Sequence, residues 1–132
     1  MIYLDTHVVA WLYAGRVDLI PDLARSLIEG NELLISPMVG LELQYLYEIG
    51  RTGKPAEEVL ATLRAPLGLV VCDLPFEQVA TTARDQNWTR DPFDRIIVSH
   101  AVINDVPLLT RDRAIQDAYQ GAAWDGRGAA GR

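Results

Sequence analysis

Short apolar, β-favouring runs alternate with longer helix-like segments along almost the whole chain, and this order limits the possible folds more than any other feature. The runs lie at residues 2–5, 33–35, 69–72 and 107–110, and residues 122–124 offer a further edge strand. Each run is too short for a helix. Strands that alternate with helices need crossover connections, which produce a parallel sheet covered on both faces. The sequence therefore predicts an α/β fold, a three-layer α/β/α domain with a central parallel sheet of four to five strands.

The chain has 132 residues, enough for one domain with a real core, and shows no repeat or linker. We expect this domain to span residues 1–124, followed by a disordered Gly-, Ala- and Arg-rich tail at residues 125–132. The apolar N-terminus lacks a basic leader, and no uncharged run is long enough to span a bilayer. The single cysteine, Cys72, is expected to be a small buried hydrophobe and suits a reducing compartment. We therefore expect a cytoplasmic protein without membrane contact.

Four acidic residues stand where predicted strands end or predicted helices begin. Asp5 and Asp112 follow the first and fourth strands, and Asp91 and Asp94 open the helix that runs to residue 102. The carboxyl ends of parallel strands share one edge of the sheet, where functional groups collect. Each acid also has a structural alternative as a helix cap, and Asp91 with Asp94 resembles a capping box. At the first helix, Thr6 can take the capping role in place of Asp5.

Glu42 is the most informative acid, because it lies on a helical stripe otherwise made of apolar residues. In the helix expected from residue 37 to 49, Val39, Leu46 and Ile49 share this stripe and are expected to face the core. A carboxylate is costly to bury unless it is paired or bound to a metal ion. Glu42 is therefore either the partner of a buried arginine or part of a metal site.

As a set, these acids would repel one another strongly at one sheet edge unless some take up protons or a divalent cation binds among them. Oxygen ligands without a His/Cys cluster favour Mg²⁺ or Mn²⁺ over zinc, and we expect His7 and His100 to be structural. Such ions suit in-line hydrolysis of phosphodiesters. They would also reconcile a net charge of −6 with a polyanionic partner. The arginines beside the acids either form surface salt bridges with them or hold RNA phosphates; they are Arg90, Arg95, Arg111 and Arg113.

Four motifs in order resemble the PIN domain, and in particular the VapC ribonuclease toxins of bacterial toxin–antitoxin pairs. They are Y-L-D-T-H at residues 3–7, S-P-M-V-G-L-E-L at 36–43, R-D-P-F-D-R at 90–95 and L-L-T-R-D at 108–112. The likeness extends to about Trp124. It implies an α/β/α fold and an endoribonuclease that uses Mg²⁺ or Mn²⁺ to cut RNA. Related chains often carry a His shortly before D-P-F-D, and here that segment is N-W-T-R at 87–90.

The resemblance also implies roles for individual residues. The catalytic acids would be Asp5, Glu42, Asp94 and Asp112. Asp91 is a further metal ligand in the D-P-F-D variant, and its share of the work relative to Asp94 stays open. Thr6 would support the site through its hydroxyl.

The family implies a small antitoxin as partner and a homodimer. Residues 41–47 put apolar or aromatic side chains on more than one helix face, which suits either a partner surface or full burial inside the monomer. Two other functions fit the residues as well: a PIN-like module that binds RNA or protein without cutting, and a housekeeping RNA-processing nuclease.

Overall fold

A computed structural model of the chain describes residues 1–126. Helices and strands alternate in it as the sequence predicts, with one short 3₁₀ turn, η1. The elements are β1 (Ile2–Leu4), α1 (Thr6–Ala14), η1 (Val17–Leu19), α2 (Asp22–Gly30), β2 (Leu33–Ile35), α3 (Pro37–Glu48), α4 (Ala56–Leu67), β3 (Val70–Val71), α5 (Phe76–Arg84), α6 (Pro92–Asn104), β4 (Leu108–Leu109), α7 (Arg113–Ala118) and β5 (Ala122–Ala123). Most of the tail predicted to be disordered, residues 127–132, lies outside the described residues. No helix of the described part is both long and apolar enough to cross a membrane.

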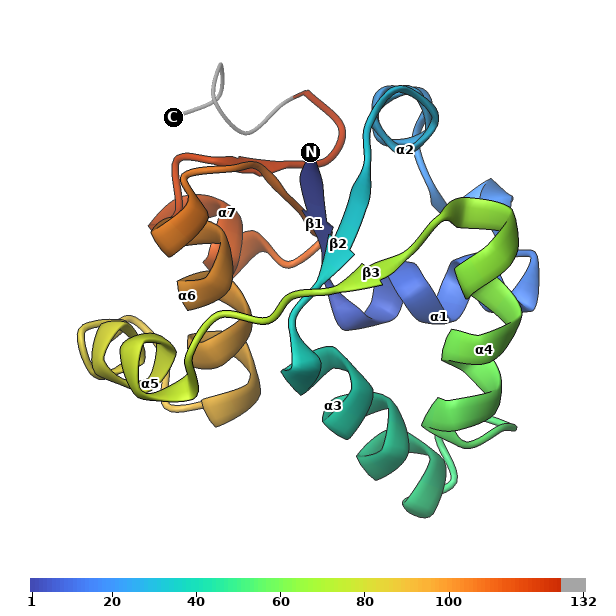
Figure 1. The fold of residues 1–132 in the computed structure, drawn as a ribbon. Helices are drawn as coiled ribbons and strands as arrows, with labels where there is room; N and C mark the ends of the chain where they lie inside the picture. Colours follow the sequence, from blue (N-terminus) through green and yellow to red (C-terminus); the bar gives the residue numbers. More distant parts are fainter. Residues whose placement is uncertain (127–132) are drawn as a thin grey trace.

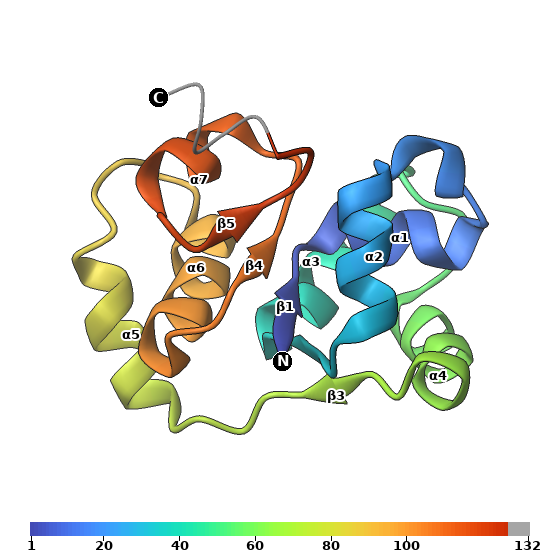
Figure 2. The same cartoon turned by 90° about the horizontal axis from the view of Figure 1, so that it is seen from above.

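The five strands form one sheet in the order β3-β2-β1-β4-β5, and every neighbouring pair is parallel. Tyr3 in the central strand is in register with Leu34 on one side and Leu108 on the other. In Figures 1 and 2, α1, α2 and α4 lie on one side of the sheet and α5, α6 and α7 on the other. The α/β class and the all-parallel sheet are therefore confirmed.

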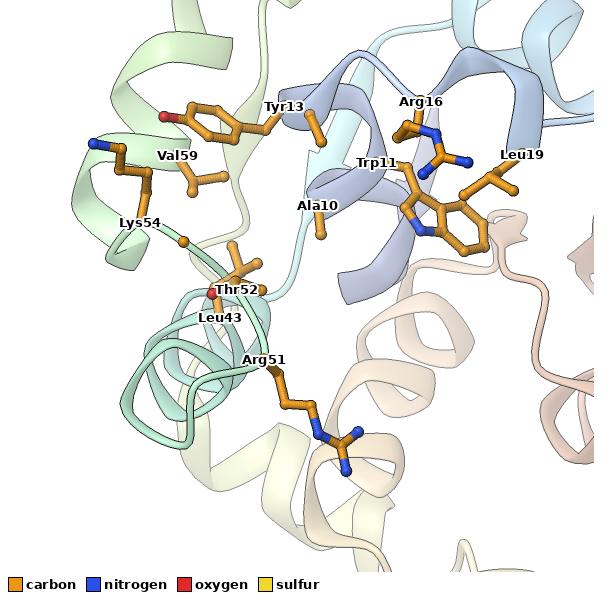
Figure 3. Close-up of a pocket in the computed structure, with 12 residues that line it drawn as sticks. Ala10, Trp11, Tyr13, Arg16, Leu19, Leu43, Arg51, Thr52, Lys54 and Val59 are labelled. Atoms are coloured by element: carbon orange, nitrogen blue, oxygen red, sulfur yellow. The ribbon is translucent and has the colours of Figure 1, made fainter.

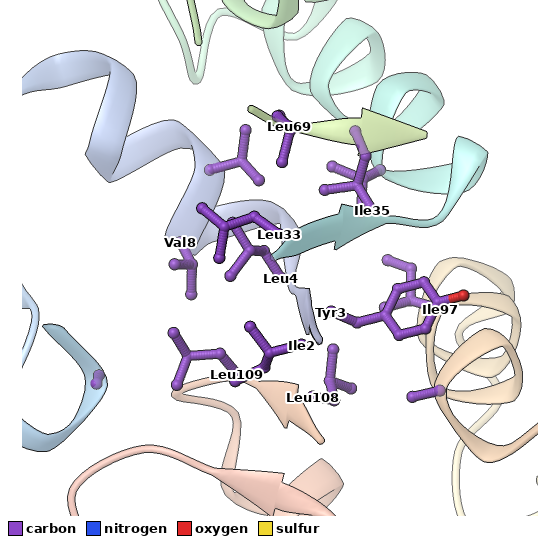
Figure 4. Close-up of a cluster of buried hydrophobic side chains, with 14 of the residues drawn as sticks. Ile2, Tyr3, Leu4, Val8, Leu33, Ile35, Leu69, Ile97, Leu108 and Leu109 are labelled. Atoms are coloured by element: carbon purple, nitrogen blue, oxygen red, sulfur yellow. The ribbon is translucent and has the colours of Figure 1, made fainter. Parts of the chain in front are cut away.

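The core is built around β1. Its residues Ile2, Tyr3 and Leu4 are at most 1% exposed and contact apolar side chains of β2, β4 and α6 (Figure 4). A strand buried on both faces needs a continuous apolar run, which is what these residues provide. The Tyr3 hydroxyl donates to Sγ of Cys72 at 2.8 Å. Cys72 packs against the core as a partly buried side chain, so it is less buried than expected and also accepts a hydrogen bond.

The residues at which helices begin agree with the sequence prediction better than the residues on their buried faces do. The Ser36 side chain accepts the N–H of Met38 and Pro37 is the first residue of α3, as expected. Ile49, expected on the inward stripe, is 48% exposed, because α3 ends one residue before it. The end of α3 therefore projects beyond the core, whereas Val39 is fully buried in the core and Glu42 and Leu46 lie at the sheet edge.

Candidate metal centre

All five predicted acids line one pocket of about 240 Å³ at the carboxyl edge of the sheet. It lies where β1 and β4 end and where α1, α6 and α7 begin. The lining residues are Asp5, Thr6, His7, Glu42, Leu46, Asp91, Asp94 and Asp112. Acids from both halves of the chain are brought together because the central strand β1 pairs directly with β4.

Asp5 is fixed at the centre of this edge. It is 3% exposed and is the N-cap of α1: its Oδ1 accepts the N–H of Thr6 at 2.8 Å, and its Oδ2 accepts the hydroxyl of Thr110 at 2.6 Å. The expectation that Thr6 caps this helix is therefore wrong. Thr6 is already the first helical residue, because β1 ends at Leu4.

The hydroxyl of Thr6 instead donates to Oε1 of Glu42 at 2.5 Å. Glu42 is half-buried on α3, and no arginine pairs with it among residues 1–126. This excludes the buried ion pair as the reason for a carboxylate on this stripe. Burial raises the pKa of Glu42; the Thr6 hydrogen bond opposes this shift, and the nearby carboxylates, Asp5 first, add to it.

Asp91 and Asp94 differ in what their oxygens do. Asp91 is the N-cap of α6, and its Oδ1 accepts the N–H groups of Phe93 at 2.8 Å and Asp94 at 3.3 Å. The Asp94 carboxylate is half-buried and accepts no hydrogen bond within the described residues. Burial raises the pKa of Asp94 to about 8, with contributions from the surrounding carboxylates, Asp91 first. Asp94 is the acid with the greatest need for a cation.

Asp112 is both an acid of the pocket and the N-cap of α7. Its Oδ1 accepts the N–H groups of Ala114 at 2.9 Å and Ile115 at 3.2 Å. Its own N–H donates to Oγ1 of Thr110 at 3.0 Å. Capping and membership of the acid pocket thus coexist at Asp5, Asp91 and Asp112, and the two alternatives that the sequence left open are compatible.

Two polar residues of this edge are not among the sequence-predicted site residues. Thr110 is fully buried and bridges Asp5 and Asp112; the signal for it was a hydroxyl at the end of a buried strand. His7 lines the pocket with its Nδ1 3.7 Å from Oδ2 of Asp5, while its Nε2 accepts the N–H of Arg111 at 3.1 Å. Burial lowers the pKa of His7, in keeping with a neutral ring that accepts this hydrogen bond.

None of the four arginines expected near phosphates forms an ion pair with an acid of the pocket in the described part of the chain. Arg90 and Arg95 donate to backbone carbonyls, Arg95 to those of Thr89 and Ala83. Arg113 lies 3.4 Å from Asp125, and Arg111 has its guanidinium carbon 5.2 Å from the centroid of a Trp11 ring. Surface salt bridges with the neighbouring candidate acids therefore do not explain these arginines.

The donor set fits a hard divalent cation. Five carboxylates, no cysteine and a single His at the margin are the ligand chemistry of Mg²⁺ or Mn²⁺. In residues 1–126 no three acidic, His or Cys side chains already have the spacing of a coordination sphere. Mg²⁺ commonly binds through one or two carboxylates and keeps several waters. The pocket thus suits a hydrated ion held by few direct ligands.

Comparison with known proteins gives one family and several similar structures. The family model described as PIN domain matches residues 2–121. No curated protein sequence matches the chain.

A chain of VapBC2 from Rickettsia felis, solved bound to a DNA fragment from their promoter, has 22% identity and a TM-score of 0.58, over 95% of this chain and 100% of that one. A toxin–antitoxin complex from Klebsiella pneumoniae gives 17% identity and a TM-score of 0.65, over 93% and 96%. VapBC-1 from nontypeable Haemophilus influenzae gives 23% identity and a TM-score of 0.57, over 89% and 94%. At these identities, the likeness establishes a shared fold.

Proposed function

This chain belongs to the PIN domain family, and from that premise we propose that it is an Mg²⁺- or Mn²⁺-dependent endoribonuclease, the toxin of a VapC-type toxin–antitoxin pair. The observation that carries the proposal is the convergence of Asp5, Glu42, Asp91, Asp94 and Asp112 on one pocket. A nuclease needs such a cluster to bind the cation that its phosphodiester chemistry requires. A module that only bound RNA would gain nothing from five carboxylates, which repel phosphate.

Within this proposal the residues divide into ligands and supports. Asp5, Glu42, Asp94 and Asp112 hold the cation, and when bound it would polarise a phosphate oxygen and lower the pKa of its water. Thr6 holds Oε1 of Glu42 in place.

We propose a small antitoxin as the partner of this chain, and a homodimer as its resting assembly. Support comes from the complexes among the similar structures and from an exposed apolar surface on α3. Leu41, Tyr45 and Tyr47 are 58%, 48% and 40% exposed, so their full burial inside the monomer, one of the two alternatives, is wrong. Large apolar side chains that share one exposed helix often mark a protein interface. We propose the cytoplasm, where RNA is available, as the location.

The test is cleavage by the purified protein with Mg²⁺ or Mn²⁺, together with sequencing of RNA ends after induced expression. We expect Asp5→Asn and Glu42→Gln to lower cleavage by about a hundredfold or more, since even supporting residues of metal sites are worth about 10–100-fold. Glu29→Gln, at an exposed acid of α2, is the matched control. Equal activity in all four proteins would refute the proposal. A small antitoxin gene beside this one separates a toxin from a housekeeping nuclease.

A further inference from the structure

Arg111 differs from the other arginines near the acid pocket, because its guanidinium has no acceptor. Arg90 and Arg95 donate to backbone carbonyls, and Arg113 forms an ion pair. The Arg111 side chain is exposed and makes neither a hydrogen bond nor an ion pair within the described chain, although Asp112 follows it directly. Its N–H donors are therefore free to bind an anion from solution.

Trp11 supports this free guanidinium with one face of its indole. The guanidinium carbon of Arg111 lies 5.2 Å from the centroid of a Trp11 ring, within the range of a cation–π contact. The indole lies on the side of α1 opposite the Tyr13 ring (Figure 3), and its centroid is 6.0 Å from that of the buried Trp124 ring. A planar cation that is already stacked on a fixed ring loses little freedom when it binds an anion.

The main chain of Arg111 is fixed at the margin of the acid pocket. Its N–H donates to Nε2 of His7 at 3.1 Å, and His7 and Asp112 both line the pocket. Burial lowers the pKa of His7; Asp5 opposes this shift, and the charge of Arg111 adds to it. The guanidinium therefore lies close enough to act on a residue that lines the pocket.

An RNA phosphate matches this position better than an acidic side chain of a protein partner does. The five carboxylates of the pocket repel any polyanion, and a cation at the margin offsets that repulsion where a strand arrives. A strand with one phosphate at the acids must place a neighbouring phosphate close to them, whereas an acidic protein has no such requirement. A guanidinium can donate two parallel hydrogen bonds to phosphate oxygens.

We propose that Arg111 binds a backbone phosphate of the RNA beside the scissile one, and that Trp11 positions its guanidinium for this contact. The inference rests on the nuclease function proposed above. Arg111 is then a substrate-binding residue, and Trp11 is a positioning residue that acts through it. Of the four arginines beside the acids, this assigns the phosphate contact to the one whose donors are free.

The salt dependence of RNA binding tests the phosphate contact without cleavage. Fluorescence anisotropy in EDTA gives the affinity of a 12-nucleotide RNA at several salt concentrations. Each phosphate contact contributes about 0.7–0.9 to the slope of log affinity against log salt concentration. Arg111→Gln should lower the slope by this amount and weaken binding about tenfold at low salt. Arg111→Lys keeps the charge and should retain most of the slope. Arg64→Gln, the same charge change at an exposed cation of α4, should leave the slope unchanged.

Trp11 should affect RNA binding only when Arg111 is present. Because a cation–π contact at an exposed site is worth about threefold in affinity, Trp11→Leu should weaken binding by that factor, and Trp11→Phe should not. In the Arg111→Gln background, Trp11→Leu should have no further effect. A Trp11 that only stabilised the fold would instead weaken binding equally in both backgrounds, which would overturn its positioning role. Circular dichroism checks that each variant is folded.

Cleavage kinetics separate substrate binding from chemistry. A phosphate contact present in both the bound substrate and the transition state should raise KM about tenfold in Arg111→Gln and change kcat by less than about threefold. An unchanged salt slope in folded Arg111→Gln overturns the proposal, and so does a loss of antitoxin binding with RNA binding intact. Failure of the nuclease proposal would appear separately, as absence of cleavage by the parent protein with Mg²⁺ or Mn²⁺.

Discussion

The hydroxyl of Thr110 donates a 2.6 Å hydrogen bond to Oδ2 of Asp5, across 105 positions of sequence. The same hydroxyl accepts the N–H of Asp112 at 3.0 Å. One fully buried side chain at the end of β4 therefore sets the position of two acids of the pocket. The adjacency of β1 and β4 makes this contact possible.

Replacement of this hydroxyl tests the link. Thr110→Val keeps the shape but leaves Oδ2 of Asp5 and the N–H of Asp112 without their hydrogen-bond partner, so we expect a loss of about 1–3 kcal/mol in the free energy of unfolding. Cleavage should fall by about 10–100-fold, as for other supporting residues of metal sites. Thr110→Ser retains the hydroxyl and should keep most of the stability and most of the cleavage activity. Urea unfolding and RNA cleavage measure the two effects, and full activity in Thr110→Val would show that Asp5 needs no such support.

The raised pKa of Asp94 predicts how stability depends on pH. Between the ordinary value of 3.8 and the folded value of about 8, the folded state holds a proton that the unfolded state has lost. The metal-free protein should therefore lose stability as the pH rises through this window. Asp94→Asn should make that decline shallower, and the raised pKa of Glu42 should keep part of it. At pH 9 the variant should be more stable than the parent by about 1 kcal/mol, because solvent screening reduces the effect of the shift at this partly exposed carboxyl. Urea unfolding in EDTA at pH 5, 7 and 9 provides the comparison, with Glu29→Gln expected to follow the parent.

Substitution of the two acids of D-P-F-D, Asp91 and Asp94, should affect RNA cleavage to different degrees. Asp91→Asn keeps a good helix cap, and the first turn of α6 needs little else from this residue, so we expect less than about tenfold loss of cleavage. Asp94→Asn should cost about a hundredfold or more, because this carboxylate is free of hydrogen bonds within the described chain. Asp91→Ala removes the cap and should cost about 1 kcal/mol of stability. A larger loss of cleavage in Asp91→Asn than in Asp94→Asn would reverse the division of roles.

Divalent cations should stabilise the folded protein. A ligand that binds only the folded state at a hundred times its Kd adds about 2.7 kcal/mol. We expect Mn²⁺ to raise the melting temperature of the parent, more at pH 8 than at pH 5 because protonated carboxylates do not bind metal. Glu42→Gln and Asp94→Asn should respond weakly. Thermal melts with Mn²⁺ and then EDTA measure this, and an equal Mn²⁺ response in parent and both variants would place the ion elsewhere.

Much of the fold follows from local patterns in the sequence. Ser36 with Pro37, and Asp91 with Pro92, begin helices where the sequence says they should, because capping and the fixed φ of proline act within a few residues. The parallel sheet follows from the alternation of strands and helices. The exposure of Ile49 does not follow from the sequence pattern. Helical spacing predicts which face of the helix is apolar, but not the residue at which the helix extends beyond the core.

The site divides in the same way. Each acid is visible from its place after a strand or at a helix start, and Glu42 from its stripe. The roles of Thr110 and His7 depend on which strands are neighbours and on how the side chains turn at the sheet edge. The spacing of residues along the chain does not show that Thr110 and His7 lie beside these acids.

Asp5, Asp91 and Asp112 each cap a helix as well as lining the pocket. Asn and Ser cap helices about as well as Asp does. A homologue that has lost catalytic activity can therefore carry Asn or Ser at these three positions with little loss of stability, because the helix caps and the fold are kept. Glu42 and Asp94 cap no helix, and their partly buried carboxylates destabilise the metal-free fold. We therefore expect them to be kept only where the site is under selection. Among homologues, substitutions at these two positions should be the first to mark proteins that have lost catalytic activity.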